Sequence, residues 1–355
     1  MTMRLLDKIK LIKNDWPMLK FFFRSVFKQD QPFFGLFFQI TDRCNARCAM
    51  CFNWQKINKG NKELSLDEIN KISKSMGTVP ALSIGGGEPF FRDDLPEICE
   101  IFYKNNKTKR ISIPTNSLLT EKILQSTKRI LELCPIKVSI VLSLDGVGEI
   151  HDKIRGVKGI FQKVLENYKN LTALALERPN LRINVNSTIS SENEDYISEL
   201  IDFVDENLNV KFHTLEVIRG SFNEKNIKAP SLEKYKRLIN RLMASKTLGK
   251  DEIHKLFYGA YHQLALRTMA EKKQIIPCRI SSFMPVIDAE GNVYNCELLP
   301  PVGNIRETGY NFMKIWHSDK AKKQRRDIAD KRCYCTHYCY QIQNIPMSPV
   351  QLLKL

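Results

Sequence analysis

The sequence has no uninterrupted hydrophobic run of the about 20 residues that a transmembrane helix requires. Its most apolar N-terminal stretch, residues 21–40, is broken by several charged residues and by Pro32. No signal peptide opens the chain, so we expect a soluble protein of the reducing cytoplasm. The 355 residues, 43% hydrophobic and 26% charged, are ordinary for a globular protein of about two domains. This composition excludes disordered and fibrous classes.

Acidic residues are few relative to basic ones. The 39 Asp and Glu residues face 55 Lys and Arg residues, which leaves a net charge of +16. Such an excess attracts polyanions of any kind, including nucleic acid, anionic lipid and phosphorylated metabolites. The basic run at residues 320–332 has no interleaved aromatic residues that could stack on bases. We therefore interpret it as a solvated helix face and do not expect a nucleic-acid partner.

Residues 1–34 form a basic, amphipathic N-terminal extension with two helical pieces separated at Pro17. We interpret the extension as helix packed against the side of the core. The alternative is a helix that lies on an anionic membrane through residues 1–30, which would make the protein peripheral at the membrane surface.

Short apolar runs alternate with segments of helical period between residues 35 and 216. The predicted strands are residues 35–40, 81–85, 110–114, 137–144, 181–188 and 211–216. Two capping boxes, Ser65 with Glu68 and Ser191 with Glu194, predict starts of the intervening helices. Six strand–helix units in succession predict an α/β fold with a parallel sheet, either doubly wound or a partial barrel. In both architectures ligands bind at the C-terminal ends of the strands.

The first cysteine cluster directly follows the first predicted strand. Cys44, Cys48 and Cys51 have the spacing Cys-x3-Cys-x2-Cys, with no fourth cysteine nearby. Three sulfurs are too few for a structural zinc site, which has four protein ligands. They suit three corners of a 4Fe-4S cluster and leave one iron open for a non-protein ligand. We expect Arg43 and Arg47 to moderate the negative charge of such a cluster.

This loop, with Phe52 after the third cysteine, resembles the signature of the radical S-adenosylmethionine (SAM) superfamily. The resemblance implies that the open iron chelates SAM, which is cleaved reductively to a 5′-deoxyadenosyl radical that abstracts a substrate hydrogen. It also implies a flavodoxin-, ferredoxin- or reductase-type electron donor as partner.

A glycine-rich element after the second predicted strand supports the resemblance. The three glycines of Gly85-Gly86-Gly87-Glu88-Pro89 allow close approach of a ligand and offer exposed N–H donors. The resemblance implies that Gly86, Gly87 and Glu88 bind the amino group of SAM. Further candidates for SAM or substrate lie at the ends of later strands: Asn116, Ser143 and Asp145, with Asn184 and Asn186 as weaker ones.

A second cysteine cluster occupies the C-terminal part of the chain. A hairpin is predicted at residues 286–294, with Gly291 in its turn. It lies between Cys278 and Cys296 and brings these two cysteines towards each other. Cys333, Cys335 and Cys339 follow. Five thiols supply four ligands and one spare, and a zinc ribbon is the structural alternative.

This arrangement resembles the SPASM domain of radical SAM enzymes, or its shortened single-cluster form, the twitch domain. The resemblance implies one auxiliary 4Fe-4S cluster, for which we expect the ligands Cys278, Cys296, Cys335 and Cys339, with Cys333 as the alternate. We expect His337 to be an ordinary surface histidine, with a role as cluster ligand as the alternative. Cys99 and Cys134 fall in predicted helices and are expected to be buried small hydrophobic residues.

Together these observations predict a partial (β/α)6, TIM-like barrel with a small C-terminal SPASM- or twitch-like domain. The expected divisions are residues 1–34, the barrel at 35–230, a helical connector at 231–273 and the cysteine-rich domain at 274–355. The expected function is radical SAM chemistry that oxidises or matures a peptide, sugar or lipid-linked substrate. No catalytic acid, base or radical donor can be assigned. The alternatives are a tRNA-modifying radical SAM enzyme and a non-enzymatic, metal-stabilised protein that binds nucleic acid.

Overall fold

The computed structural model describes residues 33–60, 62–222, 226–246, 252–348 and 350–351. The predicted N-terminal extension therefore lies, except for its last two residues, outside the described part of the chain, as does its interpretation as a membrane-surface helix. No helix among the described residues is long and apolar enough to cross a membrane.

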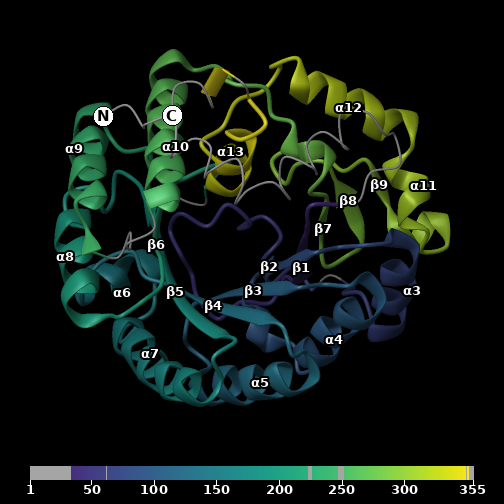
Figure 1. Cartoon of the computed structure of the whole chain (residues 1–355), viewed down its shortest axis with the longest axis horizontal. Coiled ribbons are helices and arrows are strands. Elements are labelled where there is room, and N and C mark those ends of the chain that lie inside the picture. The colour runs from purple at the N-terminus through teal and green to yellow at the C-terminus, as the bar shows by residue number, and fades with distance from the viewer. Residues whose placement is uncertain (1–32, 61, 223–225, 247–251, 349, 352–355) are drawn as a thin grey trace.

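Six parallel strands form the centre of the molecule in the order β6-β5-β4-β3-β2-β1 (Figure 1). They are β1 (Leu36–Thr41), β2 (Ala81–Gly86), β3 (Arg110–Thr115), β4 (Lys137–Ser143), β5 (Leu181–Ile189) and β6 (His213–Val217). All six predicted strands are confirmed, with ends that shift by at most two residues. Buried parallel strands are near-continuous apolar runs in sequence, which is why their positions could be predicted.

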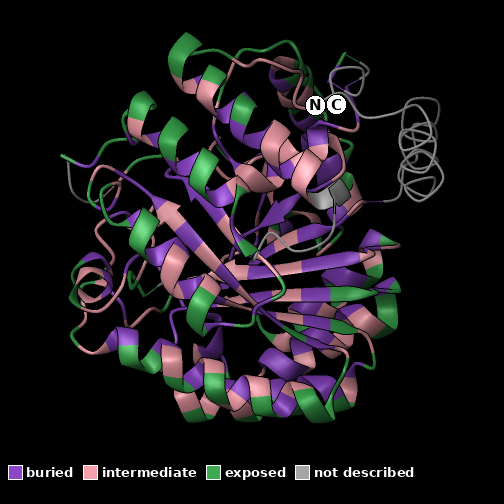
Figure 2. Ribbon diagram, turned by 60° about the vertical axis from the view of Figure 1, so that its left-hand side comes forward, coloured by how far each residue is buried: buried purple, intermediate pink, exposed green. Residues whose placement is uncertain are grey.

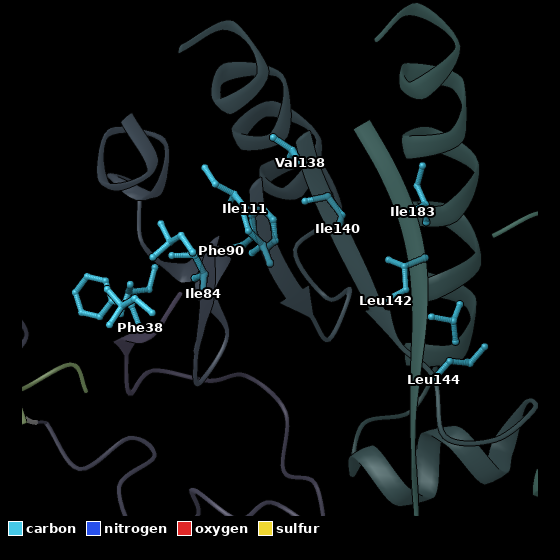
Figure 3. Packing of buried hydrophobic residues seen from close by; sticks show 14 of the residues in the cluster. Phe38, Ile84, Phe90, Ile111, Val138, Ile140, Leu142, Leu144 and Ile183 are labelled. Atoms are coloured by element: carbon cyan, nitrogen blue, oxygen red, sulfur yellow. The ribbon is translucent and has the colours of Figure 1, made fainter. Parts of the chain in front are cut away.

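Helices connect the strands and cover the outer face of the curved sheet. They are α3 (Leu66–Met76), α4 (Leu95–Asn106), α5 (Thr120–Leu133), α6 (Glu149–Arg155), α7 (Ile160–Glu177) and α8 (Ile197–Asn207). Figure 2 shows buried residues along the strands and buried residues alternating with exposed ones on the helices. The side chains of Ile111, Ile140 and Leu142 are fully or almost fully buried in this core (Figure 3). The expected partial barrel is confirmed, and it remains open between β6 and β1.

One of the two predicted capping boxes is confirmed. The Ser65 hydroxyl accepts the N–H of Glu68, and the Glu68 carboxylate accepts the N–H of Ser65 at the start of α3. The second prediction is wrong. Helix α8 begins only at Ile197, without a side-chain cap, because Glu194 instead accepts the backbone N–H of Ser231.

The C-terminal part of the chain extends the barrel sheet beyond β1. The predicted hairpin is confirmed as β7 (Val286–Ile287) and β8 (Asn292–Tyr294), which are antiparallel, and β9 (Gly303–Asn304) follows. Strand β7 pairs in parallel with β1, so that Phe37 lies opposite Val286. The hairpin is thus anchored beside the loop that carries the first three cysteines.

The remaining helices enclose the open side of the barrel (Figure 1). They are α9 (Leu232–Met243), α10 (Glu252–Glu271), α11 (Phe312–Trp316), α12 (Asp319–Ala329) and α13 (Tyr338–Asn344). Tyr258 of α10 is buried against the free edge of β6, where its hydroxyl accepts the backbone N–H of Leu215. Most basic side chains of α12 and its end are exposed, which confirms the predicted solvated face.

Candidate active site

The loop with the first three cysteines is held by hydrogen bonds from both sides. The Asn58 side chain accepts the N–H of Cys44 at 2.9 Å and donates to its carbonyl at 2.8 Å. From α6, the carbonyl of Arg155 accepts the N–H of Arg47 at 3.0 Å. Burial raises the pKa of the Cys44 and Cys51 thiols to about 11. A cation bound to the sulfurs would oppose this effect, because coordination deprotonates a thiol.

Gly86 and Gly87 allow the end of β2 to lie directly against the cysteine loop. A Cβ atom on Gly86 would come within 2.2 Å of the Thr41 carbonyl oxygen, and one on Gly87 within 2.2 Å of that of Arg43. The expectation that the glycines of this turn offer free N–H donors is wrong for Gly87, and the N–H of the following Glu88 is also paired. The N–H of Gly87 binds the Thr41 carbonyl, and the N–H of Glu88 binds that of Arg43. The glycines therefore fix the position of the cysteine loop.

One cavity of about 280 Å³ brings together residues from the C-terminal ends of several strands. The cysteines and most of the predicted SAM-binding residues line it, namely Cys44, Cys48, Cys51, Gly86, Gly87, Glu88, Asn116 and Ser143. Asn186 also lines the cavity, whereas Asn184 does not and instead donates to Ser139 at 3.1 Å.

Glu88 is the most constrained carboxylate of the cavity wall and is 1% exposed. It accepts the Thr115 hydroxyl at 2.9 Å and the backbone N–H of Asn116 at 2.7 Å. Burial raises the pKa of Glu88 to about 7, against the opposing effect of these donors. The carboxylate is therefore held in a single orientation beside the cysteine loop.

Asp145 does not line the cavity but lies behind it. Its fully buried carboxylate forms an ion pair with Arg155 at 2.6 Å. Arg155 does line the cavity and places a guanidinium N–H 3.8 Å from the sulfur of Cys48. The positive charge beside the thiols thus comes from Arg155, whereas Arg43 is paired with Glu63 and Arg47 is exposed. The contact of Arg155 with Cys48 could not be predicted, because nothing local signals a contact between residues 107 positions apart.

A network of three charged side chains, which local sequence patterns did not reveal, borders the cavity after β6. Arg219 binds Glu216 at 2.8 Å and Glu297 at 2.9 Å, and all three side chains are largely buried. Glu216 and Arg219 line the cavity, and Glu297 follows Cys296 in the C-terminal cysteine cluster. This buried network therefore runs from the cavity of the first cysteine cluster to the residue that follows Cys296.

In the C-terminal cluster the structure brings four thiols to one small cavity. These are Cys278, Cys296, Cys333 and Cys335. Two of the sulfurs already receive amide N–H donors, Cys278 from Asn344 at 3.4 Å and Cys333 from Gln274 at 3.9 Å. Cys339 does not line this cavity, and the charges acting on its thiol are those of Glu216, Arg219 and Glu297. The arrangement favours Cys333 over Cys339 as the fourth member of the set.

The prediction for His337 is wrong. Its side chain is 1% exposed and packs against the rings of Phe37 and Tyr340, with Nε2 3.5 Å from Glu297. Burial holds the pKa of His337 well below its ordinary value. The prediction that Cys99 and Cys134 are buried is confirmed, since both are fully enclosed.

The donor sets suit iron–sulfur clusters. Among the residues that the structure describes, no three His, Cys, Asp or Glu side chains are grouped as ligands of a metal ion. The surroundings of the thiols nevertheless fit iron–sulfur clusters, because the sulfurs share a cavity and receive N–H donors, which tune such clusters in proteins. A partial barrel with three thiols at the ends of its strands and a second thiol set in an appended domain defines an iron–sulfur protein.

Family models identify this protein class further. The model of the radical SAM superfamily matches residues 38–204, and that of an iron–sulfur cluster-binding domain, SPASM, matches residues 278–340. The chain therefore contains a radical SAM domain followed by a SPASM domain. Its domains imply a 4Fe-4S cluster with SAM and auxiliary iron–sulfur binding.

Individual relatives agree with this assignment. The chain is 30% identical over 169 residues to Fe-coproporphyrin III synthase of Methanosarcina barkeri, and 28% identical over 189 residues to pre-heme d1 synthase of Dinoroseobacter shibae. These matches cover 47% and 53% of this chain but only 40% and 44% of the relatives. The solved structure of Streptococcus suis SuiB bound to S-adenosylmethionine has a TM-score of 0.59 at 18% identity, with 83% of this chain and 68% of that chain covered. This likeness shows the shared fold.

Proposed function

We propose that this enzyme uses SAM to remove a hydrogen atom from its substrate and that the net reaction is an oxidation, as in a maturase or dehydrogenase. One observation carries the proposal: three thiols and the candidate SAM-binding groups line a single cavity. They come from the ends of β1, β2, β3 and β4, the edge where partial barrels bind ligands.

Cys44, Cys48 and Cys51 would hold the reactive cluster. When bound, a 4Fe-4S cluster supplies the single electron that cleaves SAM to methionine and the 5′-deoxyadenosyl radical, which then takes a hydrogen atom from the substrate. Arg155 supplies a fixed positive charge and an N–H donor beside Cys48. The Glu88 carboxylate is fixed by the backbone N–H of Asn116, and the Asn116 carboxamide is fixed by its bond to Asn45. Glu88 and Asn116 provide acceptor and donor groups for the polar ends of SAM. Gly86, Gly87 and Ser143 complete that wall, and Asp145 acts through Arg155.

The second thiol set supports the oxidative outcome. After loss of a hydrogen atom, a substrate must still give up one electron and one proton to complete a two-electron oxidation. We assign one auxiliary cluster, as the electron acceptor, to Cys278, Cys296, Cys335 and a fourth cysteine, for which the cavity favours Cys333. The buried network from Glu216 to Glu297 connects the reaction cavity with this site.

The names of the relatives do not point to one substrate class. Their names include synthases of two tetrapyrroles and a probable GTP 3′,8-cyclase of Methanococcus maripaludis, which are different reactions. The enzyme also requires an electron donor, for which we propose a flavodoxin-, ferredoxin- or reductase-type partner.

The experiment measures iron and sulfide per chain after anaerobic reconstitution, together with 5′-deoxyadenosine formed from SAM under dithionite. For the unaltered chain we expect about eight irons and SAM cleavage. The triple variant Cys44→Ala/Cys48→Ala/Cys51→Ala is expected to keep about four irons and to lose cleavage. Retained cleavage in the triple variant would contradict the assignment, and zinc in place of iron would remove the radical mechanism.

A further inference from the structure

A second cavity lies beside the proposed SAM site. Its volume is about 320 Å³, and it lies between the cysteine loop, the segment after β6 and the C-terminal hairpin. It shares Phe52 with the cavity of the three cysteines. The partition between the two cavities consists of Phe52, the Arg219 guanidinium 4.8 Å above its ring, and Glu297, which binds Arg219.

The volumes of the two cavities indicate which ligand each cavity binds. Pockets that bury drug-sized ligands have volumes of roughly 300–1,000 Å³. SAM is itself a ligand of that size, and a cavity of about 280 Å³ is at the lower end of this range, that is, of the size of one such ligand. The adjoining cavity is therefore the place for the substrate, with the partition as the point of contact.

The charges in this second cavity are balanced, although the whole chain carries +16. Among the residues that line it, the charged side chains are Lys56 and Glu297. Lys56 binds Asp288 at 2.8 Å, and Glu297 binds Arg219 at 2.9 Å. A phosphate or carboxylate placed here would find no cation that is not already paired.

The polar groups that remain in the wall are neutral. Gln39 of β1 is only 7% exposed and lines the cavity, and its side chain has no hydrogen-bond partner among the described residues. The side chains of Asn53 and Ser221 also line the cavity without such a partner. A carboxamide in the wall of a cavity offers one acceptor and two donors to a ligand. Phe52, Val286 and Leu298 supply apolar surface around these groups.

We propose that this cavity binds a neutral, amide-bearing part of the substrate, such as a peptide unit or carboxamide, through Gln39 and Asn53. An amide presents the donor and acceptor that complement a carboxamide side chain. The assignment of this ligand as substrate rests on the proposed function, but the binding itself does not.

The test uses N-acetylalanine methylamide as probe at millimolar concentration, with binding to the reconstituted protein observed by saturation-transfer NMR. Methyl glucoside and pyrophosphate are measured in parallel. We expect the amide to bind the unaltered protein and its signal to fall at least about fivefold in Gln39→Leu and in Asn53→Ala, as expected for the loss of one hydrogen bond of about 1 kcal/mol or more. The exposed helix variant Gln125→Leu serves as the matched control and is expected to bind normally.

Equal amide signals in the unaltered protein and both cavity variants would overturn the proposal, as would binding of the glucoside or pyrophosphate alone. Asn53→Ala keeps the test valid if Gln39→Leu does not fold, because the Asn53 side chain makes no bond to the described residues. SAM cleavage is measured on the same samples. Amide binding without cleavage would refute the proposed function alone, and cleavage without amide binding would refute this inference alone.

Discussion

A guanidinium N–H of Arg155 lies 3.8 Å from the sulfur of Cys48, although the two residues are 107 positions apart. The arginine is held there by its ion pair with Asp145, whose carboxylate is fully buried and also accepts the N–H of Thr188 at 2.8 Å. A single buried charge pair therefore sets the electrostatic surroundings of one proposed cluster ligand.

Arg155→Met is expected to lower the free energy of unfolding by about 3–5 kcal/mol, because it leaves the buried Asp145 carboxylate without its counter-charge. Urea unfolding of the cluster-free protein measures this loss. The double variant with Asp145→Asn should recover much of it, since the uncompensated charge is then absent. Arg237→Met, which breaks an exposed pair with Glu233, should cost less than about 1 kcal/mol. Equal losses in the two arginine variants would contradict the prediction.

Gly87→Ala is expected to displace the cysteine loop, because the new Cβ would lie 2.2 Å from a backbone carbonyl oxygen that cannot move independently. We expect the protein to lose about four irons per chain and SAM cleavage, while the C-terminal cluster remains. The matched control is Gly85→Ala, two residues earlier, where a Cβ would meet nothing within 4 Å. A Gly87→Ala protein with full iron content and cleavage would show that the loop tolerates the contact.

The variants Cys333→Ala and Cys339→Ala should differ in the amount of iron bound at the auxiliary site. Cys333 shares a cavity with Cys278, Cys296 and Cys335, whereas Cys339 does not. We expect Cys333→Ala to reduce the auxiliary iron strongly and Cys339→Ala to leave it nearly unchanged, with iron analysis and EPR as the measurements. The opposite pattern would assign the fourth ligand to Cys339.

Glu68 joins the barrel to the C-terminal domain through Arg306 at 2.7 Å. The hydrogen bond from Arg306 lowers the pKa of Glu68 to about 2 from its ordinary value of 4.5. A carboxyl with a lowered pKa in the folded state stabilises the protein above its unfolded pKa, and this stabilisation is lost as pH falls from about 4.5 to 2. Glu68→Gln keeps the capping bond to Ser65 and removes the charge.

We therefore expect Glu68→Gln to be less stable than the unaltered cluster-free protein by about 0.5–1 kcal/mol at neutral pH. Thermal unfolding at a series of pH values should show this difference shrinking over the stated window. A difference that is constant from neutral pH to acid would mean that the ion pair makes no contribution.

Features that depend on short-range sequence patterns could be predicted well. The six strands are apolar runs, and the cap at Ser65 uses a partner three residues away. The cap predicted at Ser191 failed because its proposed partner, Glu194, bonds to Ser231 instead, a tertiary contact that no local pattern reveals. The prediction that His337 lies at the surface failed for the same reason. Its neighbours Phe37 and Tyr340 are brought together only when the C-terminal part of the chain folds against β1.

The same distinction between local patterns and tertiary contacts applies to the residues of the candidate site. Cys44, Cys48, Cys51 and the glycine turn are contiguous motifs and could be located from spacing. Arg155, Arg219 and the choice between Cys333 and Cys339 depend on which segments fold against each other. The substrate cavity is lined by unremarkable residue types such as Gln39, and only their placement in the fold makes them noticeable.

The parallel pairing of Phe37 with Val286 has a consequence for synthesis of the chain. A ribosome releases β1 roughly 250 residues before β7, which at about 5–20 residues per second is an interval of roughly 12–50 s. Throughout that interval one edge of β1 has unpaired backbone groups, the condition in which nascent sheets associate with other chains. The C-terminal domain thus also acts as an edge cover, and a chain truncated before β7 should require a chaperone to remain in solution.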